Sequence, residues 1–158
     1  LKVLAAEGLV TMKVRRGAYV TEVSEEDLRN VYHLLGLLES DAAGVVATKA
    51  TEAEQQDLQT LHGELEASAA DRERFFELNE RFHMRLLEIA DNRWRDQMVA
   101  DLRKVMKLNR QNSLLKSGRI AESLAEHRAI ITALLARDAA GATKAMQVHF
   151  RNGLEAAA

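Results

Sequence analysis

The sequence of 158 residues contains no cysteine and no proline, and only 4% of its residues are aromatic. The lack of cysteine excludes disulfides and thiolate metal sites, and it fits a reducing compartment. The lack of proline, with abundant Ala, Leu, Glu and Arg, favours an all-helical domain. Because aromatic residues are scarce, we expect a core built mostly from Leu, Val, Ile, Met and Ala.

Long apolar runs are also missing. No run approaches the roughly 18 residues of a membrane span, and the start of the chain has no signal-peptide pattern. We therefore expect a cytoplasmic protein with no membrane partner. The length and the apolar fraction of 47% predict one domain, or one domain plus a fragment. Because the chain begins at Leu1 rather than at Met, we expect an N-terminal segment to be missing from it.

The net charge of −2 argues against a polyanion partner for the chain as a whole, but this average hides an asymmetry. Residues 1–23 contain four basic and two acidic side chains, a local charge of +2, which leaves −4 for the remainder. Three of the four basic residues lie close together, at Lys13, Arg15 and Arg16.

The same segment holds the single strand-like stretch of the sequence. Residues 1–7 read as the end of a helix that stops at Gly8, and residues 9–23 are rich in β-branched residues around a basic turn, Arg15-Arg16-Gly17. This order of elements is found at the end of a winged helix-turn-helix, where the end of a helix is followed by a glycine, a strand, a basic turn and a second strand. The alternative is a small hairpin docked on a helical bundle.

Beyond residue 23 the apolar spacing is helical throughout. Ser24 is a predicted helix cap, Thr51 and Glu54 form a predicted capping box, and Asp71 is a predicted cap of the next helix. The expected helices cover about 25–49, 52–68, 72–90, 94–115, 119–136 and 139–155. Short turns join them, so the fold class is predicted to be all-α, an antiparallel bundle of about six helices over residues 24–158.

The central stretch is Arg74–Ala90, where Asn79 and His83 lie four residues apart on one face of a helix that also supplies core residues. Burying such polar groups without partners costs on the order of 1–3 kcal/mol each. The best candidate partners are His127 and His149, which also lie beside the apolar stripes of their helices.

Two interpretations of His83, His127 and His149 remain open. Three imidazoles facing one bundle interior favour a divalent metal, with zinc or nickel as the expected ion. The alternative is three core histidines that are each hydrogen-bonded separately. Glu80 and His83 also match the Glu-x-x-His half of a di-iron carboxylate site, but the sequence has no second copy, which argues against a ferritin-like oxidase.

Several segments together resemble GntR-family transcriptional regulators of the FadR subfamily, whose C-terminal FCD domain binds an effector. The resemblance covers essentially the whole chain. It is carried by these residues: Leu4–Val10, Arg15–Val20, Glu26–Leu28, Leu38-Glu39, Phe82-His83, Ala90–Asn92, Glu126–Ile130, Asp138-Ala139 and Met146–His149.

The resemblance implies a divalent metal held by His83, His127 and His149, with Asn79 where the family has Asp. An Asn carbonyl coordinates without supplying charge, so we expect weaker metal binding or a different preferred ion. Gly36 is a second departure, because the family often has an arginine there that helps to hold an acidic effector.

The resemblance also implies that residues 1–23 are the C-terminal remnant of a winged-helix DNA-binding domain, with Lys13, Arg15 and Arg16 as DNA contacts. The intact protein would be a homodimer that binds operator DNA and responds to a small carboxylate. Ser123, one turn before His127, and Arg110 are candidate effector contacts, although a solvated Arg110 is the simpler reading. The alternative function is a metal-dependent helical-bundle enzyme with a vestigial hairpin.

Overall fold

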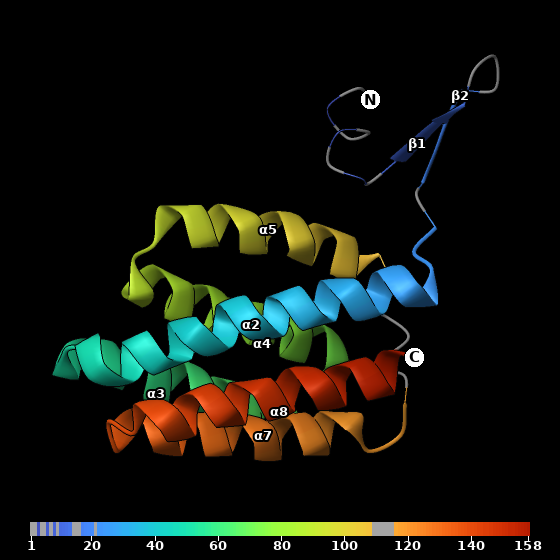
Figure 1. Cartoon of the computed structure of the whole chain (residues 1–158). Coiled ribbons are helices and arrows are strands. Elements are labelled where there is room, and N and C mark those ends of the chain that lie inside the picture. Colours follow the sequence, from blue (N-terminus) through green and yellow to red (C-terminus); the bar gives the residue numbers. More distant parts are fainter. Residues whose placement is uncertain are drawn as a thin grey trace.

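The computed structural model describes residues 3, 6, 8, 10–13, 17–20, 22–108 and 116–158, with the backbone alone for residues 11–13 and 17–20. The described part contains six long helices, which lie along one another as a bundle (Figure 1). None of the described helices is both long and apolar enough to cross a membrane. The helices are α2 (Glu25–Lys49), α3 (Glu52–Ala67), α4 (Arg72–Ala90), α5 (Arg93–Lys107), α7 (Arg119–Leu135) and α8 (Ala139–Ala157).

Side-chain caps set the beginnings of these helices, as the sequence predicted. The Ser24 hydroxyl accepts a hydrogen bond from the Asp27 amide, and Thr51 and Glu54 form the reciprocal capping box. The Asp71 carboxylate accepts from the amide of Arg74 at the start of α4. These caps satisfy amides that have no partner within the helix. The predicted all-α bundle is confirmed.

The length of one helix differs from the expectation. The helix expected over residues 94–115 is α5, which ends at Lys107; residues 109–115 lie outside the described part. Gly36 and Gly44 lie inside α2, which is a continuous helix. A Cβ on Gly44 would come 2.6 Å from the Thr143 hydroxyl of α8, so this glycine allows close packing of the two helices.

The strand-like segment forms a hairpin. Strand β1 (Val10–Lys13) pairs antiparallel with β2 (Gly17–Val20), and Val10 lies opposite Val20. Gly8 has a positive φ of 76°, as expected for a helix stop. The hairpin projects past the end of the bundle where α2 begins (Figure 1). Arg15 and Arg16 lie outside the described residues, and Lys13 is described by its backbone in β1.

The apolar core lies between α2, α4, α7 and α8. Leu35, Phe82, Ile130 and Met146 are each fully buried in one large cluster. A smaller cluster around Phe75 joins α3, α4 and α7. The larger cluster borders a group of buried polar side chains that includes three histidines.

Candidate functional site

Three buried histidines from three helices meet inside the bundle. His83 of α4 is 1% exposed, His127 of α7 is 0% exposed and His149 of α8 is 9% exposed. One nitrogen atom of each lies within 4.8 Å of the others, and the ring centroids are 4.8–5.3 Å apart. Imidazole binds zinc at about 2.0–2.1 Å, so two nitrogens on one ion lie at most about 4.2 Å apart, which is close to the separation found here.

Two of the three imidazoles are oriented by buried carboxylates. His83 Nδ1 lies 2.8 Å from Glu39 Oε1, and His149 Nδ1 lies 2.6 Å from Glu126 Oε2. An ionised carboxylate can only accept hydrogen bonds, so each Nδ1 carries the proton and each Nε2 carries the lone pair. This carboxylate–histidine arrangement is typical of metal ligands, because it fixes the tautomer and the ring orientation.

His127 differs from the other two. Neither of its ring nitrogens has a hydrogen-bond partner among the described residues, although the side chain is fully buried. Burial, with smaller effects from His149 and His83, lowers its pKa well below the ordinary value, so the ring is neutral near pH 7. A buried neutral imidazole with unpartnered nitrogens fits a metal ligand better than a separately hydrogen-bonded core histidine.

Asn79 lies one turn before His83 on α4, and both side chains line the same cavity. The Asn79 Oδ1 atom is buried and has no hydrogen-bond partner in the described part of the chain. An amide oxygen is a metal ligand of neutral charge, or an acceptor for a hydroxyl group. The residues present therefore fit a metal ion held by three imidazoles, with the amide oxygen close by.

The cavity has a volume of about 60 Å³ and a mixed polar and apolar lining. Ser123, predicted as an effector contact, lines it and is 4% exposed. Arg110, the other predicted contact, lies outside the described residues. Two further arginines, Arg103 of α5 and Arg119 of α7, line the same cavity.

Arg103 is 2% exposed and is held by two glutamates. Its Nε and Nη2 atoms donate to the two Glu39 oxygens at 3.0 and 2.7 Å, and Nη1 donates to Glu80 at 3.2 Å. Burial lowers the pKa of Arg103, but the Glu39 carboxylate outweighs burial and leaves the pKa raised. The Glu39 carboxylate therefore bridges a permanent cation and the candidate ligand His83.

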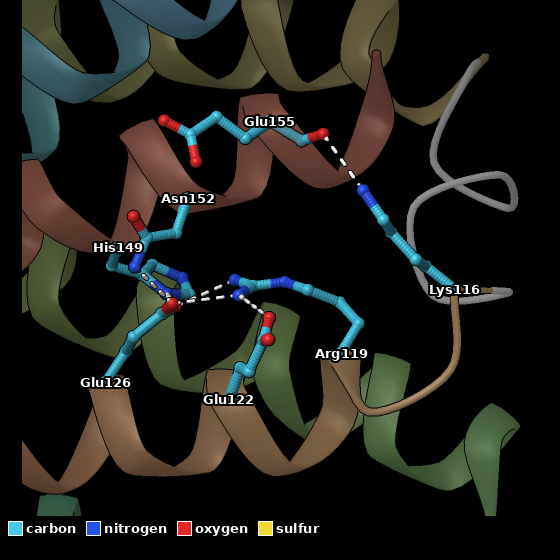
Figure 2. A network of polar contacts seen from close by, with 7 residues as sticks. All are labelled: Lys116, Arg119, Glu122, Glu126, His149, Asn152 and Glu155. Carbon is cyan, nitrogen blue, oxygen red and sulfur yellow. Dashed lines mark hydrogen bonds and ion pairs between the residues drawn. The ribbon is translucent and has the colours of Figure 1, made fainter.

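An equivalent arrangement surrounds Glu126 (Figure 2). Arg119 donates to both Glu126 oxygens at 2.8 and 2.7 Å, and Asn152 donates to Oε1 at 2.9 Å. Burial raises the pKa of Glu126, but the hydrogen bonds from His149 and Arg119 outweigh it and lower the pKa to about 2. Two Arg–Glu–His chains thus reach the histidine cluster, one through His83 and one through His149.

Sequence reasoning did not assign site roles to Glu39, Arg103, Arg119 or Glu126. A signal for Arg103 was present, because it falls on the apolar stripe of its helix between Val99 and Met106. Arg119 and Glu126 are seven residues apart, which places them on one helical face. A charged residue on a buried stripe requires a partner, but the helical pattern does not identify that partner.

The Glu80 carboxylate contacts two basic side chains of α5. It binds Arg103 Nη1 at 3.2 Å and Lys107 Nζ at 3.0 Å.

Comparison with known proteins identifies the family. The sequence model of the FCD domain matches residues 30–152. The chain is 29% identical over 150 residues to the HTH-type transcriptional repressor RspR of Escherichia coli (strain K12), covering 94% of this chain and 66% of that protein. It is 27% identical over 172 residues to the HTH-type transcriptional regulator LutR of Bacillus subtilis (strain 168), covering 96% of this chain and 78% of that protein.

Solved structures share the fold. E. coli McbR/YncC superposes with a TM-score of 0.85 at 18% identity, covering 95% of this chain and 77% of that chain. Streptococcus agalactiae GntR superposes with a TM-score of 0.70 at 23% identity, covering 98% of this chain and 78% of that chain.

The expectation of a regulator rather than an enzyme agrees with the names of RspR and LutR. The chain belongs to the FCD domain family, the effector-binding domain of GntR-family transcriptional regulators.

Proposed function

We propose that this chain is the ligand-responsive part of a bacterial DNA-binding transcriptional regulator, and that its bundle binds a divalent metal and a small organic acid. The observation that carries the proposal is the unpartnered, fully buried His127 between two carboxylate-oriented histidines. Zinc or nickel suits three neutral imidazoles.

In this proposal His83, His127 and His149 hold the ion, and the Asn79 amide oxygen is the fourth protein donor. When bound, the metal supplies a concentrated positive charge that attracts an anionic ligand. Glu39 and Glu126 keep two of the imidazoles in the tautomer that presents Nε2. The apolar walls around the cluster, including Phe82 and Phe150, limit the access of water.

The effector would occupy the cavity beside the histidines. Ser123 would contribute a hydroxyl group, and Arg103 and Arg119, one from each Arg–Glu–His chain, would contribute N–H donors. Arg110 remains a predicted effector contact on sequence grounds alone.

For the intact protein we propose a cytoplasmic homodimer that binds operator DNA and has no membrane partner. The hairpin supports residues 1–23 as the wing end of a winged helix-turn-helix, followed by the FCD domain at residues 24–158. Lys13, Arg15 and Arg16 would contact the DNA backbone. The chain spans 66% of the length of RspR.

Elemental analysis tests the metal site. Protein purified without chelators and without a histidine tag should retain about one zinc or nickel ion per chain. His127→Ala should abolish this binding, whereas His33→Ala, on the exposed surface of α2, should not. Failure of the unaltered protein to bind either ion at micromolar concentration would contradict the proposal.

Thermal shifts then test the effector. A small carboxylate that binds at the metal should raise the melting temperature of metal-loaded protein and leave metal-free protein unchanged, because a ligand stabilises the state to which it binds. Equal shifts in both forms would locate the carboxylate away from the histidines.

A further inference from the structure

The donors of the proposed metal site carry no negative charge. His83, His127 and His149 offer neutral nitrogens, and Asn79 offers a neutral amide oxygen. A divalent ion in this position keeps both of its positive charges. Inside a bundle such charges are poorly screened, so they require compensation from nearby groups.

The surrounding carboxylates do not supply that compensation, because each is already matched by a buried cation. Glu39 is neutralised by Arg103, and Glu126 is neutralised by Arg119 through two hydrogen bonds. The neighbouring carboxylate of Glu80 is likewise paired with a cation, Lys107.

Among the described residues, Glu122 also contacts Arg119, but its side chain is 68% exposed and screened by water. Counted over the described residues, the buried charges of these two Arg–Glu pairs sum to zero before a metal binds. Two positive charges therefore remain to be balanced once it does.

The cavity offers further donors for an anion. A guanidinium group has five N–H bonds, and the described residues accept from three of those on Arg103 and three of those on Arg119. Both side chains are 3% exposed, so their remaining N–H groups are shielded from bulk water. The volume of about 60 Å³ limits the occupant to a compact molecule.

We propose that the effector is a compact dianion of the short dicarboxylate class, with one carboxylate at the metal and the other beside Arg103 and Arg119. This inference rests on the proposed metal site and specifies the charge of its ligand. It also makes Asn79 a specificity-determining residue, because an aspartate there would supply one of the two negative charges and favour a monoanion.

The test uses pairs of ligands that differ by one charge and keep the same shape: malonate against malonamate, and succinate against succinamate. Each is titrated by calorimetry into zinc-loaded protein near pH 7.5, and the zinc content is measured before and after so that extraction of the ion is not counted as binding. We expect at least one dicarboxylate to bind more tightly than its monoamide by about tenfold or more.

Asn79→Asp is the decisive variant, since it adds a charge without changing the size of the side chain. We expect it to reduce the preference for the dicarboxylate to about threefold or less. Asn30→Asp adds the same charge on the exposed surface of α2 and should leave the preference unchanged. Circular dichroism and melting temperatures establish that both variants are folded.

Equal or tighter binding of the monoamides would overturn the inference, as would a preference that Asn79→Asp leaves intact. Failure of all four ligands to bind at millimolar concentration would overturn it as well. Protein that retains no zinc in the first measurement would instead overturn the metal site itself, so the two failures are distinguishable.

Discussion

The Glu126 carboxylate hydrogen-bonds to His149, 23 residues away on α8, and not to His127, its neighbour in sequence. The distance from Oε2 to His149 Nδ1 is 2.6 Å. Consecutive residues on a helix point about 100° apart, so Glu126 and His127 face different neighbours. One carboxylate therefore orients a candidate ligand on another helix and leaves the adjacent one without a described partner.

We expect Glu126→Gln to weaken zinc binding by about 10- to 100-fold, because the variant loses the acceptor that fixes His149. It also leaves Arg119 without its buried partner, which should cost about 3–5 kcal/mol of stability. Competition with a zinc chelator measures the first effect, and urea denaturation measures the second.

Glu122→Gln is the matched control for this prediction. Glu122 also contacts Arg119, at 3.4 Å, but its side chain is 68% exposed. Its replacement should cost less than about 1 kcal/mol. Similar losses for the two variants would contradict a special role for Glu126.

His127→Leu should separate metal binding from stability. In metal-free protein the change removes two buried nitrogens without partners, each of which costs about 1–3 kcal/mol, so the variant should be at least as stable as the unaltered chain. Added zinc should then fail to raise its melting temperature. A marked destabilisation of the metal-free variant would mean that His127 makes a favourable polar contact.

The same residue predicts a pH dependence. The pKa of His127 is lowered below 6.5 in the folded state, so the unfolded chain takes up a proton first as the pH falls. This titration leaves the free energy of unfolding unchanged above pH 6.5. Below pH 6.5 it lowers the free energy of unfolding by at most about 1.4 kcal/mol per pH unit for one proton.

Urea denaturation of metal-free protein between pH 7.5 and 5.5 measures this dependence. Because other groups also titrate in this range, the quantity to compare is the difference in slope between the unaltered chain and His127→Leu. The variant should have the shallower slope; parallel slopes would show that His127 does not contribute.

Gly153→Ala tests the packing between α2 and α8, with Gly63→Ala in α3 as its control. A Cβ on Gly63, in α3, would meet no heavy atom within 4 Å, so Gly63→Ala should stabilise the protein by about 0.5–1 kcal/mol. A Cβ on Gly153 would lie 3.2 Å from Tyr32 Cε1, so Gly153→Ala must displace a ring that lines the cavity. We expect no net stabilisation from Gly153→Ala; equal gains at both positions would contradict this packing.

The proposed DNA contacts make a separate prediction for a protein that carries the complete winged helix. Arg15→Ala and Arg16→Ala should each weaken operator binding and reduce the slope of log affinity against log salt by about 0.9 per lost phosphate contact. Lys144→Ala removes the same charge from the exposed surface of α8 and should leave the slope unchanged. A slope unaffected by both arginine substitutions would place the wing away from the DNA backbone.

The sequence predicted the helices well because their signals are local. Ser24, the Thr51–Glu54 capping box and Asp71 each act within one turn, and each was found where it was predicted. The three histidines could also be predicted to face the interior, since each lies beside an apolar stripe. What the sequence could not supply was the pairing of Glu39 with Arg103, which lie 64 residues apart. Such pairing depends on which helices become neighbours and on how far each is displaced along the bundle axis relative to the next.

The two Arg–Glu–His chains also fix the longitudinal register of the bundle. Glu39, His83 and Arg103 join α2, α4 and α5 at one level, and Arg119, Glu126 and His149 join α7 to α8. Leucine and alanine layers repeat along a helix, so apolar contacts alone tolerate a shift of one turn. A shift of about 5.4 Å between α2 and α5 would separate Glu39 from Arg103 and leave two charges buried without partners. The same shift between α7 and α8 would break the hydrogen bond between Glu126 and His149. The polar contacts therefore select one alignment of α2, α4 and α5, and one alignment of α7 and α8, from the several that their apolar surfaces would allow.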